Sequence, residues 1–284
     1  MAVRPRNDRH GAPGDDAGGR GAAGGDRPRP GPRTPGPRRP GVDDEREHRQ
    51  DRMWAVDVIA EEVRDAEPRE IPGRLCEVVV ELLPVAGASV ALHCDGMPVR
   101  LSASGERAAY LAEIQATLGD GPCLHAGRTG APVLACDLTS GEDPGRWPVF
   151  AQQATAAGVR AMYSLPLGND SVCVGTLDLY RDTPGELTAR ELRTALLVAG
   201  VMTVALMALP RGEENGGRGA ESWLSGLAAD HDEVYQAVGM IMAQLRVGSE
   251  EALARLRAHA FARDRTALDV ARDVVAYRTR FERD

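Results

Sequence analysis

The arginine side chains near the C-terminus are the residues of this chain best suited to bind a ligand. All 34 basic residues are arginines; eight of them lie between positions 246 and 280 beside five acidic residues, a net charge of +3. Arg263 and Arg265 share a short turn, "ARDRT", and Arg257 lies one to two helical turns upstream. Guanidinium groups suit contacts with phosphates and base edges. The pattern favours a polyanionic ligand, although a helical domain of mixed charge that is merely soluble would look the same.

Catalytic chemistry has weaker support. Ser164, His125 and Asp137 are the residue types of a hydrolytic triad, but no nucleophile elbow, phosphate-binding loop, HExxH or dinucleotide fingerprint surrounds them. Cys123 in "GPCLHAG" could be a reactive thiol or, with His125, a metal or haem ligand. Two ligands do not make a site, and a buried structural cysteine explains the same residue. We therefore expect no enzymatic activity, no metal and no cofactor.

The cysteines and the N-terminal residues indicate in which cellular compartment the protein is expected. The five cysteines are odd in number, scattered, and without a CxxC pair, which is typical of reduced thiols. The N-terminus has no apolar stretch of the kind found in signal peptides. We expect a cytoplasmic protein.

Charge is distributed unevenly along the chain. Residues 1–42 contain nine arginines and four aspartates, a net charge of +5, and are otherwise dominated by Gly, Pro and Ala. Such a segment buries too little apolar surface to fold, so we predict a disordered tail, either solvated or in contact with a polyanion. The remainder contains 25 arginines and 38 acidic residues, a net charge of −13. An acidic body disfavours wholesale nonspecific nucleic-acid binding, so any such role needs a local basic face.

Residues 43–209 alternate between helical and strand patterns. Two helices are expected at the start, in "DEREHRQDRMWAVDVIAEEVRDA" and "IPGRLCEVVVELLPVAG". Strands "ASVALHC" and "MPVRLSAS" are joined by a turn at Asp95-Gly96, and "VRAMYSLPLGNDSVCVGTLDLYR" reads as a hairpin that turns at Gly168–Asp170. Between them lie two helices, "GERAAYLAEIQATLGDG" and "GRWPVFAQQATAAG", and a strand, "APVLACDL". Strand pairs separated by helices predict an α+β domain with a mainly antiparallel sheet flanked by helices.

The first domain ends with an uncharged helix. "TALLVAGVMTVALMALP", from Thr194 to Pro210, has about 17 residues, the lower limit for a membrane span. It follows "LTARELR", typical of a capped helix that starts at Thr188, so we expect a buried or dimer-facing helix and no membrane partner. Residues 210–220 are Gly-rich and polar and predict a linker. Residues 221–284 are almost entirely helix-compatible, which predicts a second, all-α domain of three helices.

The first helix of that domain carries a heptad pattern. Seven residues are spaced alternately by three and four positions: Leu224, Leu227, His231, Val234, Val238, Ile241 and Leu245. This a/d pattern is typical of a helix packed along another helix, and we predict a homodimer seam. His231 would be either a polar break that fixes the register or a partly hydrated core histidine.

A second stripe lies beside the seam, formed by Tyr235, Gly239 and Met242. Glycine inside a helix costs about 0.5–1 kcal/mol relative to alanine. We predict that Gly239 is a packing notch for the helices that follow in the same chain; a kink or a nucleic-acid contact is the alternative. Ser249 is the expected N-cap of the second helix, and Thr266 with Asp269 a loose capping box of the third.

The C-terminal segment resembles the ANTAR domain. The resemblance rests on "VYQAVGMIMAQLRVGSEEALARLRAHAFARDRTALDVARDVV", with matches at Gln236, Ala237, Gly239, Met242, Ser249, Ala252, Leu256, Arg257, Ala260, Leu268, Val270 and Ala271. One position departs, because many ANTAR domains have lysine where this chain has Val238. Upstream, "LGDGPCLHAGRTGAPVLACDL", "RWPVFAQQATAAGVRAMYSLPL" and "VGTLDLYRDTPGELTARE" resemble the GAF domain that is joined to ANTAR in high-GC actinobacteria.

The resemblance implies a cytoplasmic transcription antitermination regulator. ANTAR domains bind paired hairpin loops of nascent RNA as dimers, and a GAF domain senses a small molecule or serves as a dimerisation scaffold. Recognition of RNA loops relies on splayed bases, stacking and arginine contacts. The implied RNA-binding residues are Gln236, Arg257, Arg263, Arg265 and Arg272. A sensor or protein-interaction module that does not bind RNA is the alternative.

Overall fold

The computed structural model describes residues 42–68, 70–94, 97–169, 172–208 and 221–282; the side chains of 42–48, 51 and 221–232 are outside this description. The predicted tail, apart from Val42, and the predicted linker 210–220 also lie outside it. In chain order the elements are α1 (Val42–Val63), α2 (Ile71–Leu82), β1 (Gly87–Cys94), β2 (Met97–Ala103), α3 (Glu106–Leu118), α4 (Pro122–Thr129), β3 (Val133–Ala135), α5 (Asp143–Arg146), α6 (Pro148–Ala156), β4 (Ala161–Asn169), β5 (Val172–Arg181), α7 (Ala189–Ala208), α8 (Glu221–Leu245), α9 (Ser249–Phe261) and α10 (Ala267–Val275).

The first domain is built on one antiparallel sheet. Its strand order is β2-β1-β5-β4-β3, and every neighbouring pair is antiparallel. The two predicted hairpins are confirmed as the β1–β2 and β4–β5 pairs. Because side chains alternate across a strand, Leu177 and Leu179 of β5 face one layer while Asp178 and Tyr180 face the other.

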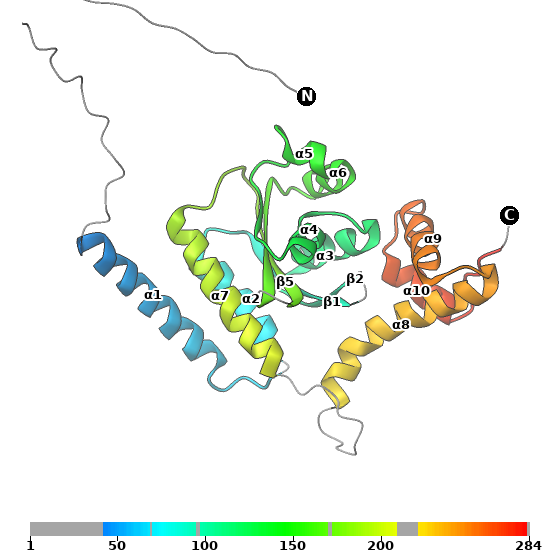
Figure 1. Ribbon diagram of the computed structural model, residues 1–284, viewed down its shortest axis with the longest axis horizontal. Helices are drawn as coiled ribbons and strands as arrows, with labels where there is room; N and C mark the ends of the chain where they lie inside the picture. The colour runs from blue at the N-terminus through cyan, green and yellow to red at the C-terminus, as the bar shows by residue number, and fades with distance from the viewer. Residues whose placement is uncertain (1–41, 69, 95–96, 170–171, 209–220, 283–284) are drawn as a thin grey trace, which may run out of the picture. The chain divides into compact units, whose positions relative to one another are not determined.

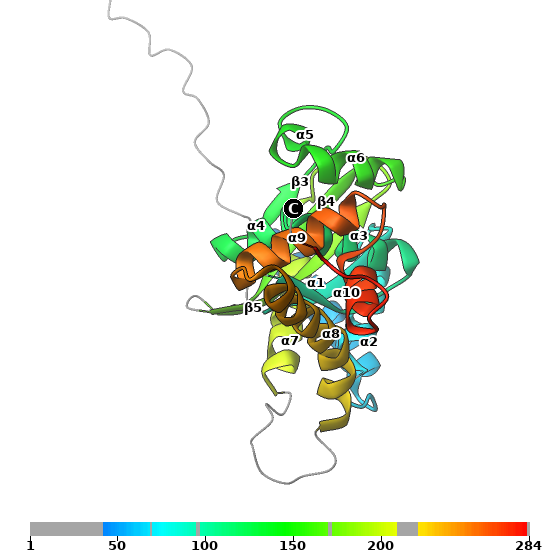
Figure 2. The same cartoon turned by 90° about the vertical axis from the view of Figure 1, so that its right-hand side faces the viewer.

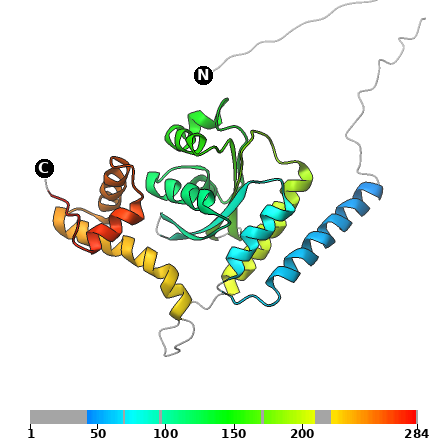
Figure 3. The same ribbon diagram turned by 180° about the vertical axis from the view of Figure 1, so that it is seen from behind.

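Helices cover both faces of the sheet, as Figure 1 shows. On one face, α2 and α7 bury their apolar sides against β1, β4 and β5, and Ile59 of α1 joins the same core. On the other face, α3, α4 and α6 enclose a second core around Phe150, Trp147 and Leu111. Seen from behind, α1 lies beside α2 and α7 (Figure 3). The predicted α+β architecture is confirmed.

The start of α7 is confirmed at Thr188 by a reciprocal capping box. The backbone N–H of Thr188 donates to Glu191 Oε2 at 2.7 Å, and the backbone N–H of Glu191 donates to Thr188 Oγ1 at 3.2 Å. Two of the otherwise unsatisfied N–H groups at the helix start are therefore paired within the first turn. Arg181 Nη2 contacts the same carboxylate at 3.1 Å, which ties the end of β5 to the start of α7.

Two short elements differ from the sequence expectations. "PCLHAGRT" forms α4, a helix that the sequence reading did not include; Pro122 at its first turn and Gly130 at φ +64 mark its ends. The single helix expected over "GRWPVFAQQATAAG" is two, α5 and α6, because Trp147 leaves helical geometry immediately before Pro148.

The second domain consists of α8, α9 and α10, which pack side by side (Figures 1 and 2). Thr266 caps α10, since its side chain accepts from the backbone N–H of Asp269 at 3.0 Å. The expected cap of α9 is wrong by one residue: Gly248 occupies the N-cap position, and Ser249 is the first helical residue.

The predicted dimer seam is used inside the chain. Val234, Val238 and Ile241 are buried, and Leu245 packs partly against the same cluster, which α9 and α10 complete with Leu256 and other apolar residues. The periodicity correctly predicted that this edge of α8 packs against other helices. Those helices are α9 and α10 of the same chain. The prediction of a dimer seam is therefore wrong for Val234, Val238, Ile241 and Leu245. The side chains of Leu224, Leu227 and His231 lie outside the described residues.

The predicted packing stripe is also corrected. Tyr235 and Gly239 are exposed, and a Cβ added at Gly239 would meet nothing within 4 Å. Only Met242 of that stripe packs partly on the helical core. Gly239 is therefore not a notch for a helix of its own chain, because α9 and α10 approach the neighbouring face of α8.

Gly239→Ala tests this correction. Alanine fits the open space and favours helix, so we expect the unfolding free energy of the helical domain to rise by about 0.5–1 kcal/mol. Urea denaturation followed by circular dichroism measures the change. Gly175→Ala is the contrasting variant, because its Cβ would lie 2.2 Å from the Ala91 carbonyl oxygen, and it should destabilise the sheet. If Gly239→Ala lowered the unfolding free energy instead, the original prediction that Gly239 allows a close helix contact would be supported.

Candidate functional site

The turn between α9 and α10 holds two of the predicted RNA-binding arginines in place. The backbone N–H groups of Arg263 and Arg265 donate to the carbonyl of Ala260 at 3.1 and 3.0 Å. Asp264 between them has φ +52, a left-handed conformation that is uncommon outside glycine. Both arginine side chains are exposed. The tight turn therefore presents two guanidinium groups to solvent from positions that are separated by one residue.

A carboxylate links this turn to the end of α10. Asp273 accepts from Arg265 Nη1 at 2.6 Å and from Arg278 Nε at 2.7 Å. Hydrogen bonds from Arg265, and then from Arg278, hold the pKa of Asp273 below its usual range. One negative charge therefore gathers two positive ones, while Arg263 makes no ion pair among the described residues. The cluster keeps an excess of positive charge at the surface.

Two exposed aromatic rings flank these arginines. Phe261 at the end of α9 is 49% exposed, and Tyr277, directly before Arg278, is 86% exposed. The sequence reading missed both. The sequence signal was their position near Arg263 and Arg278 in a chain with only 4% aromatic residues, since aromatic rings and arginines together can stack on unpaired bases. We call Phe261, Arg263, Arg265, Tyr277 and Arg278 the arginine–aromatic cluster.

The other predicted RNA-binding residues lie elsewhere. Arg272 Nε contacts Glu233 Oε2 at 2.8 Å. Glu233 precedes the exposed Gln236 by three residues on α8, so the two lie on the same side of that helix. Arg272 and Gln236 therefore belong to a second part of the surface. Arg257 is different. Its Nε donates to the Ala116 carbonyl of α3 at 3.1 Å, and burial lowers the pKa of its guanidinium.

A second contact accompanies Arg257. The backbone N–H of Ala267 donates to Thr117 Oγ1 of α3 at 2.9 Å, next to the residue that holds Arg257. Met97 and Ala116 join the apolar core of the helical domain. The five predicted RNA-binding residues therefore fall into three groups. Arg263 and Arg265 lie in the turn, Gln236 and Arg272 lie together elsewhere, and Arg257 is held against α3. The two arginines of the turn are the most accessible.

The first domain contains a buried polar cluster on the sheet face that α3 and α4 cover. Gln115 Nε2 donates to Asp178 Oδ2 at 3.2 Å, and Gln115 Oε1 accepts from the backbone N–H of Cys123 at 2.8 Å. Ser164 lies opposite Asp178 in the β4–β5 register. Ser164 Oγ and Asp178 Oδ1 are buried without a hydrogen-bond partner among the described residues. Unpaired buried polar atoms are uncommon and mark a place where a bound polar group would be stabilised.

Burial sets the protonation of this cluster. It raises the pKa of Asp178 to about 7, and the opposite Ser164 hydroxyl and then the Gln115 amide oppose the rise. Burial also raises the pKa of the Cys123 thiol well above its usual value. A thiol of this kind is neutral near pH 7, whereas reactive cysteines have lowered pKa values. The fold therefore keeps Cys123 as a buried thiol in the first turn of α4.

The residues weighed for catalysis and metal binding have separate neighbours. Ser164 faces the polar cluster, His125 lies edge-on to Trp147 with ring centroids 5.9 Å apart, and Asp137 accepts hydrogen bonds from Thr139 and Ser140. The described residues contain no group of three or more His, Cys, Asp or Glu placed to hold a metal ion.

Asp178→Asn is expected to stabilise the chain in a pH-dependent way. The unfolded carboxyl group ionises near pH 3.8, the folded one near 7. The wild type therefore loses stability as pH rises between these values, at up to about 1.4 kcal/mol per pH unit, while the amide does not ionise. The advantage of the variant in unfolding free energy should be larger at pH 8 than at pH 5 by roughly 2 kcal/mol. Urea melts at both pH values measure it, and an equal difference at both would contradict a raised pKa.

Two domain-family models match parts of this chain. The GAF domain model matches residues 65–207, and the ANTAR domain model matches residues 224–275. No match is found among the curated proteins.

Solved structures resemble the first domain in fold. A free methionine-R-sulfoxide reductase from Neisseria meningitidis, in complex with its substrate, is 16% identical, with a TM-score of 0.44 over 57% of this chain and 91% of that one. The GAF domain of a phosphoenolpyruvate-protein phosphotransferase from Coxiella burnetii is 16% identical (TM-score 0.44; 56% and 94% covered). The corresponding domain from Acinetobacter is 11% identical (TM-score 0.45; 58% and 98% covered). With its family model spanning half of the residues, the chain belongs to the GAF domain family, and its C-terminal helices form an ANTAR domain.

Proposed function

We propose that this protein is a transcription antitermination regulator of the actinobacterial kind, cytoplasmic and without enzymatic activity. Its ANTAR domains act as a pair that binds hairpin loops of nascent RNA. ANTAR is an RNA-binding antitermination domain and GAF a sensory domain. The sensory domain of this chain would control whether the RNA-binding surface is available.

The arginine–aromatic cluster is the observation that carries the RNA proposal. Arginines supply phosphate and base-edge contacts, and exposed rings supply stacking, which is worth about 1–3 kcal/mol per base. Tyr277 is largely exposed and Phe261 about half exposed, and neither belongs to the helical core. Exposed aromatic rings beside guanidinium groups fit an unpaired RNA loop better than a folded protein surface, because each base offers a flat face.

Two ion pairs favour the alternative, a sensor or interaction module that does not bind RNA. Arg265 is paired with Asp273, and Arg272 with Glu233. All four side chains are partly exposed, and solvent screens pairs of this kind, so they contribute little to stability. Phosphate can replace such a carboxylate partner, so the pairs lower the expected affinity without removing the binding surface.

The contacts of α3 give the sensory domain a route to the RNA-binding domain. Three consecutive residues of α3 make these contacts. The side chain of Gln115 donates to Asp178, and the carbonyl of Ala116 accepts from Arg257. The Thr117 hydroxyl accepts from the backbone N–H of Ala267. A small molecule that satisfies the unpaired atoms of Asp178 and Ser164 would act on the same helix. We therefore place the ligand-responsive site at the buried polar cluster.

Substitution of the cluster tests RNA binding. Arg263→Ala and Tyr277→Ala should each raise the Kd for an RNA with two hairpin loops by about 10-fold, since each removes a contact worth roughly 1–3 kcal/mol. Arg263→Ala should also make the dependence of log Kd on log salt less steep by about one unit. Fluorescence anisotropy across a salt series measures both quantities.

Matched variants and RNAs complete this experiment. Arg128→Ala removes an exposed arginine of the GAF domain and should leave the Kd unchanged. A chain ending at residue 220 should lose loop-dependent binding. Equal affinity for scrambled loops, or for the truncated chain, would place binding in the arginine-rich N-terminal segment and support the alternative function.

A further inference from the structure

An acidic side chain, Asp273, contacts two arginines of a surface that is proposed to bind a polyanion. Its Oδ2 accepts from Arg265 Nη1 at 2.6 Å. Its Oδ1 accepts from Arg278 Nε at 2.7 Å and lies 2.6 Å from Arg278 Nη2. The Asp273 side chain is 18% exposed, whereas the side chains of Arg265 and Arg278 are 38% and 62% exposed. A mostly buried carboxylate therefore holds two guanidinium groups that remain in contact with solvent.

The backbone of Asp273 also fixes the end of α10. Its carbonyl accepts from the backbone N–H groups of Arg278 and Thr279 at 2.7 and 3.1 Å, and the Val274 carbonyl accepts from Tyr277 at 3.0 Å. This pattern is a Schellman motif, in which glycine usually takes the left-handed position. Here Tyr277 takes it, with φ +58 and an exposed ring. Residues in sparsely populated conformations cluster at binding sites, and Asp273 holds this one in place.

For attraction to phosphate alone, the Asp273 carboxylate is unfavourable. It offsets one of the three arginine charges in the arginine–aromatic cluster, and binding to any polyanion strengthens with the number of cations that meet phosphates. Contacts with a base edge have a different requirement, because the planar guanidinium must lie in one orientation. A flexible arginine loses rotamer entropy when RNA immobilises it, and an arginine that is already held by a carboxylate loses less.

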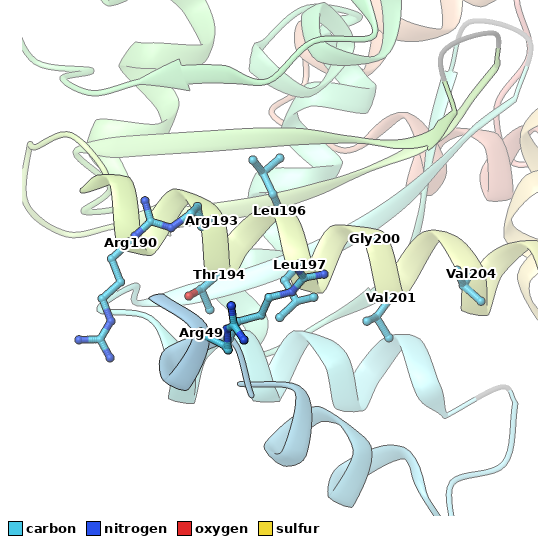
Figure 4. A pocket seen from close by; sticks show the side chains of 10 residues that line it. Arg49, Arg190, Arg193, Thr194, Leu196, Leu197, Gly200, Val201 and Val204 are labelled. Carbon is cyan, nitrogen blue, oxygen red and sulfur yellow. The ribbon is translucent and has the colours of Figure 1, made fainter. Parts of the chain in front are cut away.

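Arginines elsewhere in this chain are not gathered in this way. Arg49 and Arg52 of α1 and Arg190 and Arg193 of α7 line a groove of about 800 Å³ between these helices. Figure 4 shows the side chains of Arg190 and Arg193 pointing in different directions. Arg49, Arg52 and Arg193 make no ion pair with another described residue. The convergence of two arginines on Asp273 is therefore not a general consequence of the high arginine content.

We propose that Asp273 is a positioning residue for RNA recognition, which weakens attraction to polyanions in general and orients the arginines of the cluster for the unpaired bases of a loop. The inference rests on the proposed function, because it concerns selectivity at the same surface. Asp273 acts through Arg265 and Arg278 rather than by touching a base. Removal of its charge should therefore have opposite effects on an RNA with two hairpin loops and on the same RNA with scrambled loops.

Asp273→Asn removes the charge and keeps the size of the side chain and the backbone hydrogen bonds. We expect the Kd for the scrambled RNA to fall by about 2-fold, because the domain becomes more positive. The Kd for the RNA with two hairpin loops should rise by about 5-fold, because the arginines must then be ordered on binding. Fluorescence anisotropy of the full chain at one fixed salt concentration measures both values.

Glu251→Gln is the matched control. It removes the same charge from the same domain, at an exposed pair with Arg255 on α9 (3.3 Å), and should lower both Kd values alike. Circular dichroism checks that both variants are folded. Parallel changes for the two RNAs in Asp273→Asn would show that the carboxylate acts only through its charge, and the inference would be wrong.

Two measurements establish whether Asp273 acts through the arginines. In a chain that carries Arg265→Ala and Arg278→Ala, Asp273→Asn should no longer raise the Kd for the hairpin loops, and an undiminished rise would contradict the inference. NMR relaxation of Arg278 Nε–H, recorded without RNA, should show an ordered side chain in the wild type and a mobile one in Asp273→Asn. Equal order in both proteins would overturn the inference whatever the RNA results are.

The proposed function and this inference fail in different ways. A wild type that binds the two RNAs equally would contradict the proposed function, and the selectivity role of Asp273 with it. A selective wild type whose selectivity is unchanged in Asp273→Asn would contradict this inference alone.

Discussion

The apolar edge of α8 can be buried only once, and the arrangement of the second domain depends on that constraint. Val234, Val238 and Ile241 fill the space between α9 and α10, two short helices whose apolar stripes are too small to form a core by themselves. Once this edge is used within the chain, the turn between α9 and α10 is fixed against α8. The arginine side chains of that turn, and the aromatic rings beside them, are consequently directed away from the core.

The buried carboxylate plays a corresponding part in the first domain. An ionised Asp178 would be unfavourable in a position that is 2% exposed, and the hydrogen bond from Gln115 offsets only part of that cost. The chain therefore maintains a buried carboxyl group in the middle of the sheet, between the buried hydroxyl residues Ser89 and Ser164 of the neighbouring strands. Under the proposed function, a bound group that satisfies Asp178 and Ser164 would stabilise the domain directly.

Local patterns in the sequence predicted the elements well and their partners less well. Alternating residues in β4 and β5 and the capping residues at Thr188 and Thr266 act within a few positions, so they were readable. The burial of Asp178 could not be read from the sequence, because it depends on α3 and α4 covering β5. Helix α4 itself was not predicted, since it is a short segment bounded by Pro and Gly. The periodicity of α8 specified an apolar edge, but periodicity does not distinguish a partner in the same chain from one in a second chain. Tyr277 was overlooked because its exposure is a property of the folded turn.

These results change where a pair of ANTAR domains would be held together. If the α8 edge is internal, the apolar surface left for a second copy, among the described residues, is concentrated on α1 and α7, outside the RNA-binding domain. Pairing through this edge of α8 would compete with the packing of α9 and α10 that positions the arginine–aromatic cluster. In the first domain, α7 packs on one face of the sheet and Asp178 lies on the opposite face, which α3 covers. Under the proposed function, a ligand that shifts β5 would act through Gln115 and its neighbours in α3 on the contact that holds Arg257.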